Sequence, residues 1–314
     1  MLRIVISCLI GFVVAALGGR ILIPVLRRMK AGQSIKEIGP TWHMSKQGTP
    51  TMGGLMFIIA VIVAVAALSW QDFAAGKFGG GFVLVFALVF GVIGYIDDYF
   101  KVKKHENTGL TAPQKFILQL AAAILFTVLM RNFGYLTPDL YIPFFNVTLS
   151  VPWPLYMVFA AFVMVGCVNA VNITDGIDGL ASGVTMPVML FFTVVACWWG
   201  HYELGIFSGA LLGGLAGFLI YNFHPAKVFM GDTGSLFLGG AVCAAWPLDW
   251  ISPWCSSWWV LSTLRRLCLI LYRLDISKSP TASGSSVWPP STTIWRWAAG
   301  AKSNCSVSSP GSPW

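Results

Sequence analysis

Two adjacent carboxylates, Asp97 and Asp98, lie at the polar end of a long apolar run, in the segment from Gly94 to Lys101. One interpretation is a solvated helix end, with Asp97 paired to Lys101 four residues later. Adjacent like charges repel, however, so the pair is better explained beside a cation. Magnesium typically takes one or two carboxylates and completes its shell with water and substrate phosphates. The pair therefore indicates a cation site at this helix end.

A second polar motif follows another apolar run and repeats every three residues, at Asn169, Asn172, Asp175 and Asp178. On a helix this spacing would stack the four side chains along one face. Gly176 and Gly179 indicate instead that the backbone opens into a loop that faces a cavity. An EF-hand is excluded, because its alternating acids and terminal Glu are missing. Charge deep in a span costs about 2.5–3.5 kcal/mol or more, which disfavours a merely structural polar cap.

Two further motifs are suited to phosphate. Asp232 stands in the glycine-rich turn Gly231–Ser235, which also resembles the catalytic loop of aspartic proteases. That class needs a second matching loop in an all-β setting, and neither is present, so we favour a carboxylate at a helix start whose free N–H groups can meet a phosphate. The other motif, His43–Gly54, has Lys46 and two threonines before a Gly-Gly turn. It matches no standard nucleotide fingerprint.

The composition shows what must position these motifs. The chain has 314 residues, of which 56% are hydrophobic and 10% charged, whereas soluble domains average about 25% charged residues. A membrane span needs about 20 apolar residues. The sequence predicts an all-α, polytopic transmembrane helical bundle with eight spans: Ile4–Val25, Met52–Leu68, Phe82–Ile96, Phe116–Met130, Pro154–Val168, Ala181–Trp199, Leu204–Tyr221 and Ser235–Trp246.

Lysine and arginine residues predict the orientation, because they are enriched in cytoplasmic loops. They concentrate in the loops after the first and third runs, which places the N-terminus outside, in the periplasm. The segment Asn132–Val151 then forms a small outer hairpin. The net charge of +8 is explained by this topology, since the basic residues form no stripe with interleaved aromatics of the kind that binds nucleic acid.

With this parity, the cytoplasmic loops hold five of the twelve acidic residues of the chain: Asp97, Asp98, Asp175, Asp178 and Asp232. Lys46, Lys101 and Lys115 accompany them. Acids that hold magnesium and lysines that hold phosphate are the groups that phosphoryl transfer requires, because its catalysis is chiefly positioning and charge neutralisation. A transporter with acidic residues on an ion or proton pathway is the main alternative, although it predicts carboxylates nearer mid-span.

Together these motifs resemble the bacterial phospho-N-acetylmuramoyl-pentapeptide transferase family, within the polyprenyl-phosphate N-acetylhexosamine-1-phosphate transferase superfamily. The resemblance covers roughly residues 1–241 and rests on five segments in the family's order: His43–Gly54, Asp97-Asp98 with Lys101, Lys115 after Thr111-Ala112-Pro113, Asn169–Leu180 and Phe229–Leu236. Relatives that use other sugar nucleotides share the aspartate motifs, and a related sugar-1-phosphate transferase is therefore a second alternative.

The resemblance implies ten spans in the bacterial inner membrane, a homodimer, and transfer of phospho-N-acetylmuramoyl-pentapeptide from its UDP derivative to undecaprenyl phosphate, with Mg²⁺, giving lipid I and UMP. It implies that Asp97, Asp98 and Asp232 are catalytic and that Asp232 is the magnesium ligand. The residues that it places in substrate binding are His43, Lys46, Thr51, Lys115, Asn169, Asn172, Asp175, Asp178, Asn222 and Phe229. Phe229 would stack on uracil.

The sequence changes character after about Ala241, so we divide the chain into a transferase domain, residues 1–241, and an atypical tail, 242–314. Nine of the fourteen tryptophans lie in this tail, and only two of the twelve acidic residues do. The family's histidine-rich loop has no counterpart, since all four histidines precede residue 225. We interpret the tail as read out of frame, the alternative being an unusual genuine tail. In either case an inactive truncated homologue is a third functional alternative.

Overall fold

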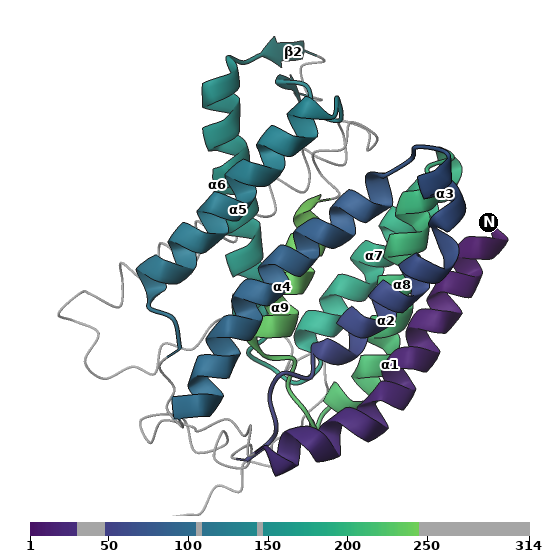
Figure 1. Cartoon of the computed structure of the whole chain (residues 1–314), viewed down its shortest axis with the longest axis vertical. Coiled ribbons are helices and arrows are strands. Elements are labelled where there is room, and N and C mark those ends of the chain that lie inside the picture. The colour runs from purple at the N-terminus through teal and green to yellow at the C-terminus, as the bar shows by residue number, and fades with distance from the viewer. Residues whose placement is uncertain (30–47, 105–108, 143–146, 245–314) are drawn as a thin grey trace, which may run out of the picture. The chain divides into compact units, whose positions relative to one another are not determined.

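The computed structural model describes residues 1–29, 48–104, 109–142 and 147–244. Helices dominate these residues, and the one sheet in the described ranges has two strands (Figure 1). The elements are α1 Leu2–Arg28, α2 Leu55–Leu68, α3 Trp70–Ala74, α4 Gly79–Lys104, α5 Ala112–Asn132, β1 Asp139–Ile142, β2 Val147–Ser150, α6 Trp153–Thr174, α7 Leu180–Trp198, α8 Tyr202–Asn222 and α9 Gly231–Ala244.

Six of the described helices, α1, α4, α5, α6, α7 and α8, are long and apolar enough to cross a membrane. They confirm the predicted polytopic helical bundle. The remaining two predicted runs coincide with α2 and α9, for each of which 14 residues are described as helix. The length of α2 falls short of the roughly 20 residues that a full crossing requires. Large apolar side chains such as Leu9 and Leu17 are exposed on α1, as expected of a surface that faces lipid.

The expected hairpin is present between α5 and α6. Strands β1 and β2 pair antiparallel, with Asp139 opposite Ser150 and Ile142 opposite Val147. The Ser150 hydroxyl donates to Oδ1 of Asp139 at 2.6 Å and so fastens the open end of the hairpin. The hairpin is thus confirmed, while its periplasmic side stays a prediction.

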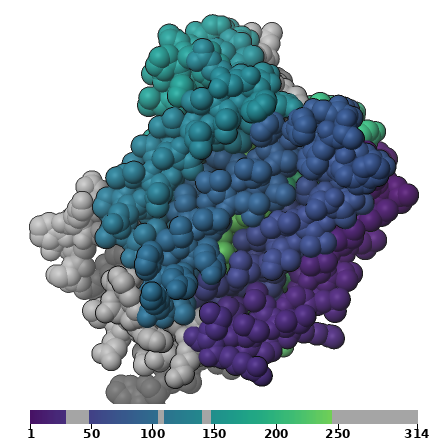
Figure 2. Space-filling view, viewed as in Figure 1, coloured from purple at the N-terminus to yellow at the C-terminus, as the bar shows by residue number. Residues whose placement is uncertain are grey.

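Helix α9 is surrounded by the other helices, and its residues from Thr233 to Ala244 are all buried. It packs against α4 and α6, and in the space-filling view only small green areas show between the blue helices (Figure 2). The ring of Phe57 on α2 lies 5.4 Å from that of Phe218 on α8 and 6.1 Å from that of Phe237 on α9. This aromatic contact joins three helices in the core.

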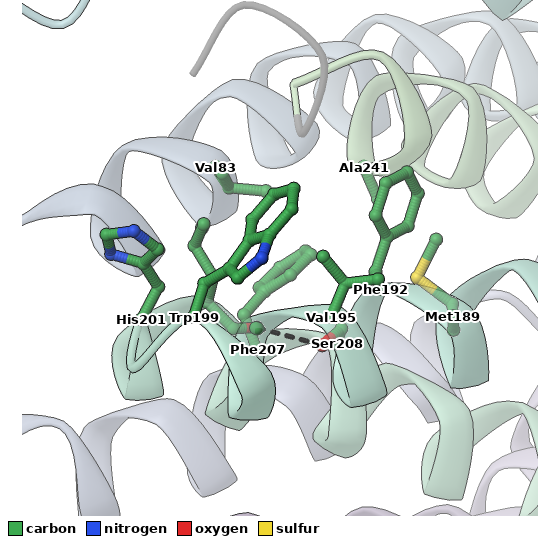
Figure 3. A pocket seen from close by; sticks show the side chains of 11 residues that line it. Val83, Met189, Phe192, Val195, Trp199, His201, Phe207, Ser208 and Ala241 are labelled. Carbon is green, nitrogen blue, oxygen red and sulfur yellow. Dashed lines mark hydrogen bonds between the residues drawn. The ribbon is translucent and has the colours of Figure 1, made fainter. Parts of the chain in front are cut away.

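Near the N-terminus of α4, the packing of the bundle is mainly apolar. A cavity of about 30 Å³ lies between α4, α7, α8 and α9 (Figure 3), lined among others by Val83, Phe192, Trp199 and Ala241. An ion pair connects α1 to α3: Arg3 donates to both carboxylate oxygens of Asp72, at 2.9 and 3.3 Å.

Candidate active site

Two glycines allow α4 and the start of α9 to come together. A Cβ on Gly94 would overlap the backbone oxygen of Asp232, so only glycine permits this approach. Gly231 has a φ of +71°, a conformation that L side chains rarely adopt. A Cβ there would also lie 2.5 Å from Oδ2 of Asp98. These two positions therefore bring the carboxylates of α4 to the first turn of α9.

Three carboxylates gather at this contact. One oxygen from each of Asp97, Asp98 and Asp232 lies within 4.8 Å of the others. Asp98 accepts two hydrogen bonds at Oδ2 from Thr233, from the backbone N at 2.9 Å and from Oγ1 at 2.7 Å. Asp97 accepts one at Oδ1 from the backbone N of Leu110 at 2.8 Å. The two α4 carboxylates are buried, and their hydrogen-bond donors belong to residues outside α4.

Two lysines balance part of the negative charge. The Nζ of Lys101 lies 2.6 Å from Oδ2 of Asp97 and 2.7 Å from Oδ2 of Asp232. The Nζ of Lys115, from α5, lies 2.9 Å from that same oxygen of Asp232. Burial alone would raise the pKa of Asp232, but a hydrogen bond with Asp97 and the two lysine charges outweigh it, so that the pKa lies below its ordinary value. Asp232 is thus held as a carboxylate.

The loop between α6 and α7 is fastened to the segment that precedes α9. Asn222 accepts from the backbone N of Gly179 at 3.1 Å and donates to the oxygen of Val228 at 2.9 Å. Oδ2 of Asp178 lies 3.0 Å from Nδ1 of His224 and accepts from the backbone N of Ala226 at 3.2 Å. These contacts set the shape of the loops that lead to Asp232.

The segment from Pro50 to Gly54 pairs with the residues before α9 through the main chain. Phe229 donates from its N to the oxygen of Pro50 at 2.9 Å and accepts at its own oxygen from the N of Gly53 at 2.8 Å. Gly54 donates to the oxygen of Met230 at 3.0 Å. This pairing brings Thr51, whose Oγ1 would lie 2.7 Å from a Cβ on Gly231, to the edge of the carboxylate cluster.

The structure brings together many of the residues predicted for the site. Asp97, Asp98, Asp232 and Lys115 share one cluster, and the described contacts connect Thr51, Asn172, Asp178, Asn222 and Phe229 to α9 or to the segment before it. Asn172 does so through Ser235, whose hydroxyl donates to its Oδ1 at 2.9 Å. His43 and Lys46 lie outside the described residues.

The predicted opening of the backbone within the motif Asn169–Asp178 is confirmed, and only Asn169 and Asn172 lie on the helix itself. Helix α6 ends at Thr174, Asp175 is its C-cap, and Asp178 lies in the following turn. Gly179 has a φ of +72° and starts α7. The backbone therefore opens where the glycines indicated, and the spacing of three loses its helical meaning there.

Sequence reasoning missed several groups that act on these residues. Gln119 accepts from Nδ2 of Asn169 at 2.6 Å, and His224 contacts Asp178 as described above. His224 lies two residues after Asn222 in the chain. Gln119 follows Lys115 by four residues, which on a helix places the side chains of Lys115 and Gln119 on one face. That spacing was the available signal for Gln119.

The carboxylate cluster fits a divalent cation. Three acidic oxygens within 4.8 Å of one another supply the hard, anionic ligands that such ions prefer. Asp97, Asp98 and Asp232 are the residues that would hold it. Lys101 lies against Asp97 and Asp232, and Lys115 against Asp232, so that carboxylates and ammonium groups together offer sites for a cation and for an anionic phosphate.

A bundle of apolar helices long enough to cross a membrane, with three carboxylates and two lysines gathered in one cluster, has the groups expected of a membrane enzyme of phosphoryl transfer. The family model described as "Glycosyl transferase family 4" matches residues 81–247, and the "Phospho-N-acetylmuramoyl-pentapeptide-transferase signature 1" matches residues 46–58.

The chain belongs to the phospho-N-acetylmuramoyl-pentapeptide-transferase family. It is 47% identical over 243 residues to the protein of that name from Clostridium acetobutylicum, covering 77% of this chain and 74% of the relative. It is 44% identical over 239 residues to that of Bacillus subtilis, covering 76% and 73%. The relative from Halalkalibacterium halodurans is 43% identical over 241 residues, covering 77% and 73%. Membership favours a transferase over the transporter alternative.

Proposed function

We propose that this protein transfers phospho-N-acetylmuramoyl-pentapeptide from its UDP derivative to undecaprenyl phosphate, giving lipid I and UMP. The observation that carries the proposal is the cluster of Asp97, Asp98 and Asp232 with two lysines against it, at the ends of helices in a membrane bundle. A lipid phosphate lies at the headgroup level and a sugar nucleotide arrives from water. The two substrates can therefore meet at the membrane–water interface, where the ends of the membrane-spanning helices lie.

In the net reaction an oxygen of the lipid phosphate bonds to the sugar-linked phosphorus of the UDP substrate, and the bond from that phosphorus to UMP breaks. Asp97 and Asp98 would be the catalytic carboxylates, and one of them would act as the base that takes a proton from the lipid phosphate. Lys101 and Lys115 contact Asp232 at 2.7 and 2.9 Å, and they would turn toward phosphate oxygens when an anionic substrate enters. Catalysis of this kind is positioning and charge neutralisation.

We propose Mg²⁺ as the cation, with Asp232 as its main ligand. A bound magnesium ion would neutralise charge on the transferring phosphate. The chain itself restrains the other groups around it: Thr233 holds Asp98 with two hydrogen bonds, and Leu110 holds Asp97 with one.

The remaining predicted residues would bind the substrates. Phe229, half-buried and placed by the main-chain pairing with Pro50 and Gly53, would stack on uracil. The side chains assigned to the surroundings of the nucleotide and its phosphates are His43, Lys46, Thr51, Lys115, Asn169, Asn172, Asp175, Asp178 and Asn222. Asp178 and Asn222 support this assignment by shaping the loops before α9.

We further propose that the protein resides in the bacterial inner membrane with its N-terminus in the periplasm and its site facing the cytoplasm. The support is the excess of lysine and arginine in the loops after the first and third predicted spans. A homodimer stays a prediction from the family resemblance.

The tail, residues 242–314, is proposed to be read out of frame, leaving residues 1–241 as the transferase domain. The family model match ends at residue 247, close to the change in composition. Sequencing the gene through codon 241 tests this: a single-base insertion or deletion that restores a span and a histidine-rich loop is expected. If no such change restores them, the tail is genuine.

The function is tested by purifying the full chain and a frame-restored version and measuring UMP release with UDP-N-acetylmuramoyl-pentapeptide, undecaprenyl phosphate and Mg²⁺. We expect release from the frame-restored protein, and little from the chain as it stands if the last spans help to close the site. UDP-N-acetylglucosamine in place of the muramoyl substrate should give no product. Failure of the frame-restored protein to release UMP would overturn the proposal, and equal use of both nucleotides would favour the related sugar-1-phosphate transferases.

A further inference from the structure

Three polar contacts connect α5, α6 and α9 in a closed series next to the carboxylates. Lys115 joins α5 to α9 through Asp232 at 2.9 Å, and Ser235 joins α9 to α6 through Asn172 at 2.9 Å. Asn169 closes the series from α6 back to α5, because its Nδ2 donates to Oε1 of Gln119 at 2.6 Å. The first two contacts involve residues already assigned to the site, whereas Gln119 has no role yet.

The orientation of the Gln119 amide follows from its neighbours. Nδ2 of Asn169 also donates to the backbone oxygen of Val165 at 2.8 Å, and a carbonyl oxygen can only accept. The amide of Asn169 therefore turns its Nδ2 toward Gln119, and Gln119 must accept this hydrogen bond at its Oε1. The Nε2 group of Gln119 points elsewhere, and it has no hydrogen-bond partner among the described residues, although the side chain is completely buried.

A buried donor without a partner costs free energy, and an apolar residue at this position would avoid that cost. Gln119 follows Lys115 by one helical turn, so both side chains leave the same face of α5. Lys115 lies against Asp232 of the carboxylate cluster, and an ammonium group and an amide N–H on one helical face are donors of the kind that bind a phosphate. The free donor is then explained by an acceptor that arrives with the substrate.

We propose that Gln119 is a substrate-binding residue whose Nε2 donates to an oxygen of a substrate phosphate, next to Lys115. This inference rests on the proposed function, because it requires a phosphate-bearing substrate. The phosphate belongs either to the polyprenyl phosphate or to the sugar nucleotide, and the two sources share this chemistry. Asn169 serves as the positioning residue that holds the Gln119 oxygen and thereby directs the nitrogen.

The test compares Gln119→Glu and Gln119→Met in the full-length, frame-restored protein. Glu keeps an acceptor for Asn169 and loses the donor, and Met keeps the length of the side chain and loses both. Gln71→Glu, at an exposed position on α3, is the matched control. UMP release is measured in two series. In the first, undecaprenyl phosphate is varied at saturating UDP-N-acetylmuramoyl-pentapeptide, and in the second, UDP-N-acetylmuramoyl-pentapeptide is varied at saturating undecaprenyl phosphate. Thermal unfolding of each purified variant is recorded in parallel.

We expect both Gln119 variants to raise KM for one of the two substrates about 10- to 100-fold, as fits the loss of a hydrogen bond to a charged group. The change in kcat should be smaller, and Gln71→Glu should behave as the parent protein. A raised KM for undecaprenyl phosphate assigns the donor to the lipid phosphate, and a raised KM for the nucleotide assigns it to the pyrophosphate.

The inference is overturned if Gln119→Met has the parent KM for both substrates, or if the variants lose only kcat and thermal stability, which would indicate packing. Should Gln119→Glu not fold, Gln119→Met decides alone. Absence of UMP release from the parent protein would instead count against the proposed function, so the two failures are distinguishable.

Discussion

At one end of α4, Asp97 and Asp98 meet a third carboxylate and two lysines, whereas near the other end Val83 lines a small apolar cavity. The two positions are separated by fourteen residues of the same helix, which is roughly 21 Å at 1.5 Å per residue. At the site end, charges are buried and depend on partners from distant parts of the chain. At the cavity end, apolar packing is accompanied by the partly exposed ion pair of Arg3 with Asp72 and by the buried carboxylate of Glu203, 3.9 Å from Nδ1 of His201. Substitutions at the two ends should therefore affect different properties.

Replacing Asp232 should produce the largest effect. Asp232→Asn removes a carboxylate that two lysines share, and we expect UMP release by the frame-restored protein to fall about 10²- to 10³-fold, the range seen when one electrostatic contact to a reacting group is lost. Asp139→Asn in the hairpin is the control and should retain activity. Near-normal turnover by Asp232→Asn would mean that the cluster is not the reacting site.

Gly94→Ala tests whether close backbone approach sets the site end. The added Cβ would overlap the backbone oxygen of Asp232, so the two helices must separate. We expect a loss of about 1–3 kcal/mol in the free energy of unfolding, typical of overpacking, together with lower kcat. Gly18→Ala on α1 meets no atom within 4 Å and should be neutral or stabilising. Equal behaviour of the two alanine variants in thermal unfolding would contradict this account.

Thr233→Val removes one of the two hydrogen bonds to Asp98 while keeping the shape of the side chain. Since hydrogen bonds to charged groups contribute about 1.5–3 kcal/mol, we predict a drop in kcat of about tenfold. Thr127→Val makes the same change on α5, where the hydroxyl bonds only to the oxygen of Ala123 among the hydrogen bonds described, and its kcat should be unchanged. Steady-state rates with both substrates saturating distinguish the variants.

Arg3→Met should have the smallest effect. The side chain of Arg3 is 36% exposed, and surface ion pairs contribute only about 0–1 kcal/mol. We expect a small decrease in thermal stability and no change in KM for either substrate. A large loss of activity from this variant would show that the two ends of the bundle are coupled, against the separation described above.

The gathering of Asp97, Asp98 and Asp232 in one cluster could be predicted from the sequence, because polar side chains at the ends of apolar runs are rare in a membrane protein. Asp97, Asp98 and Asp232 were identified this way, and parity of the spans predicted that they share one side. The hairpin between α5 and α6 followed from its turn-forming and aromatic residues. Each of these inferences needs only local patterns.

Contacts between helices could not be predicted in this way. Nothing in the spacing shows that Gly94 lies against Asp232, or that the N of Leu110 bonds to Asp97, since both depend on packing between distant segments. Nor could the periodicity of Asn169 to Asp178 show where the helix ends, because a spacing of three fits a helix and a turn equally well. Gln119 was passed over because a single glutamine in an apolar helix carries no motif.

The pairing of Phe229 with Pro50 and Gly53 uses only main-chain atoms. Its position relative to the carboxylates is thus specified without its side chain, and a different residue there would occupy the same place. Under the proposed stacking of Phe229 on uracil, position 229 is suited to engineering of nucleotide preference, with the aromatic ring exchanged for other groups while the acids and lysines keep their geometry. A short insertion between Pro50 and Gly54 would have the opposite consequence, since it would break the register that fixes this position and leave every side chain unaltered.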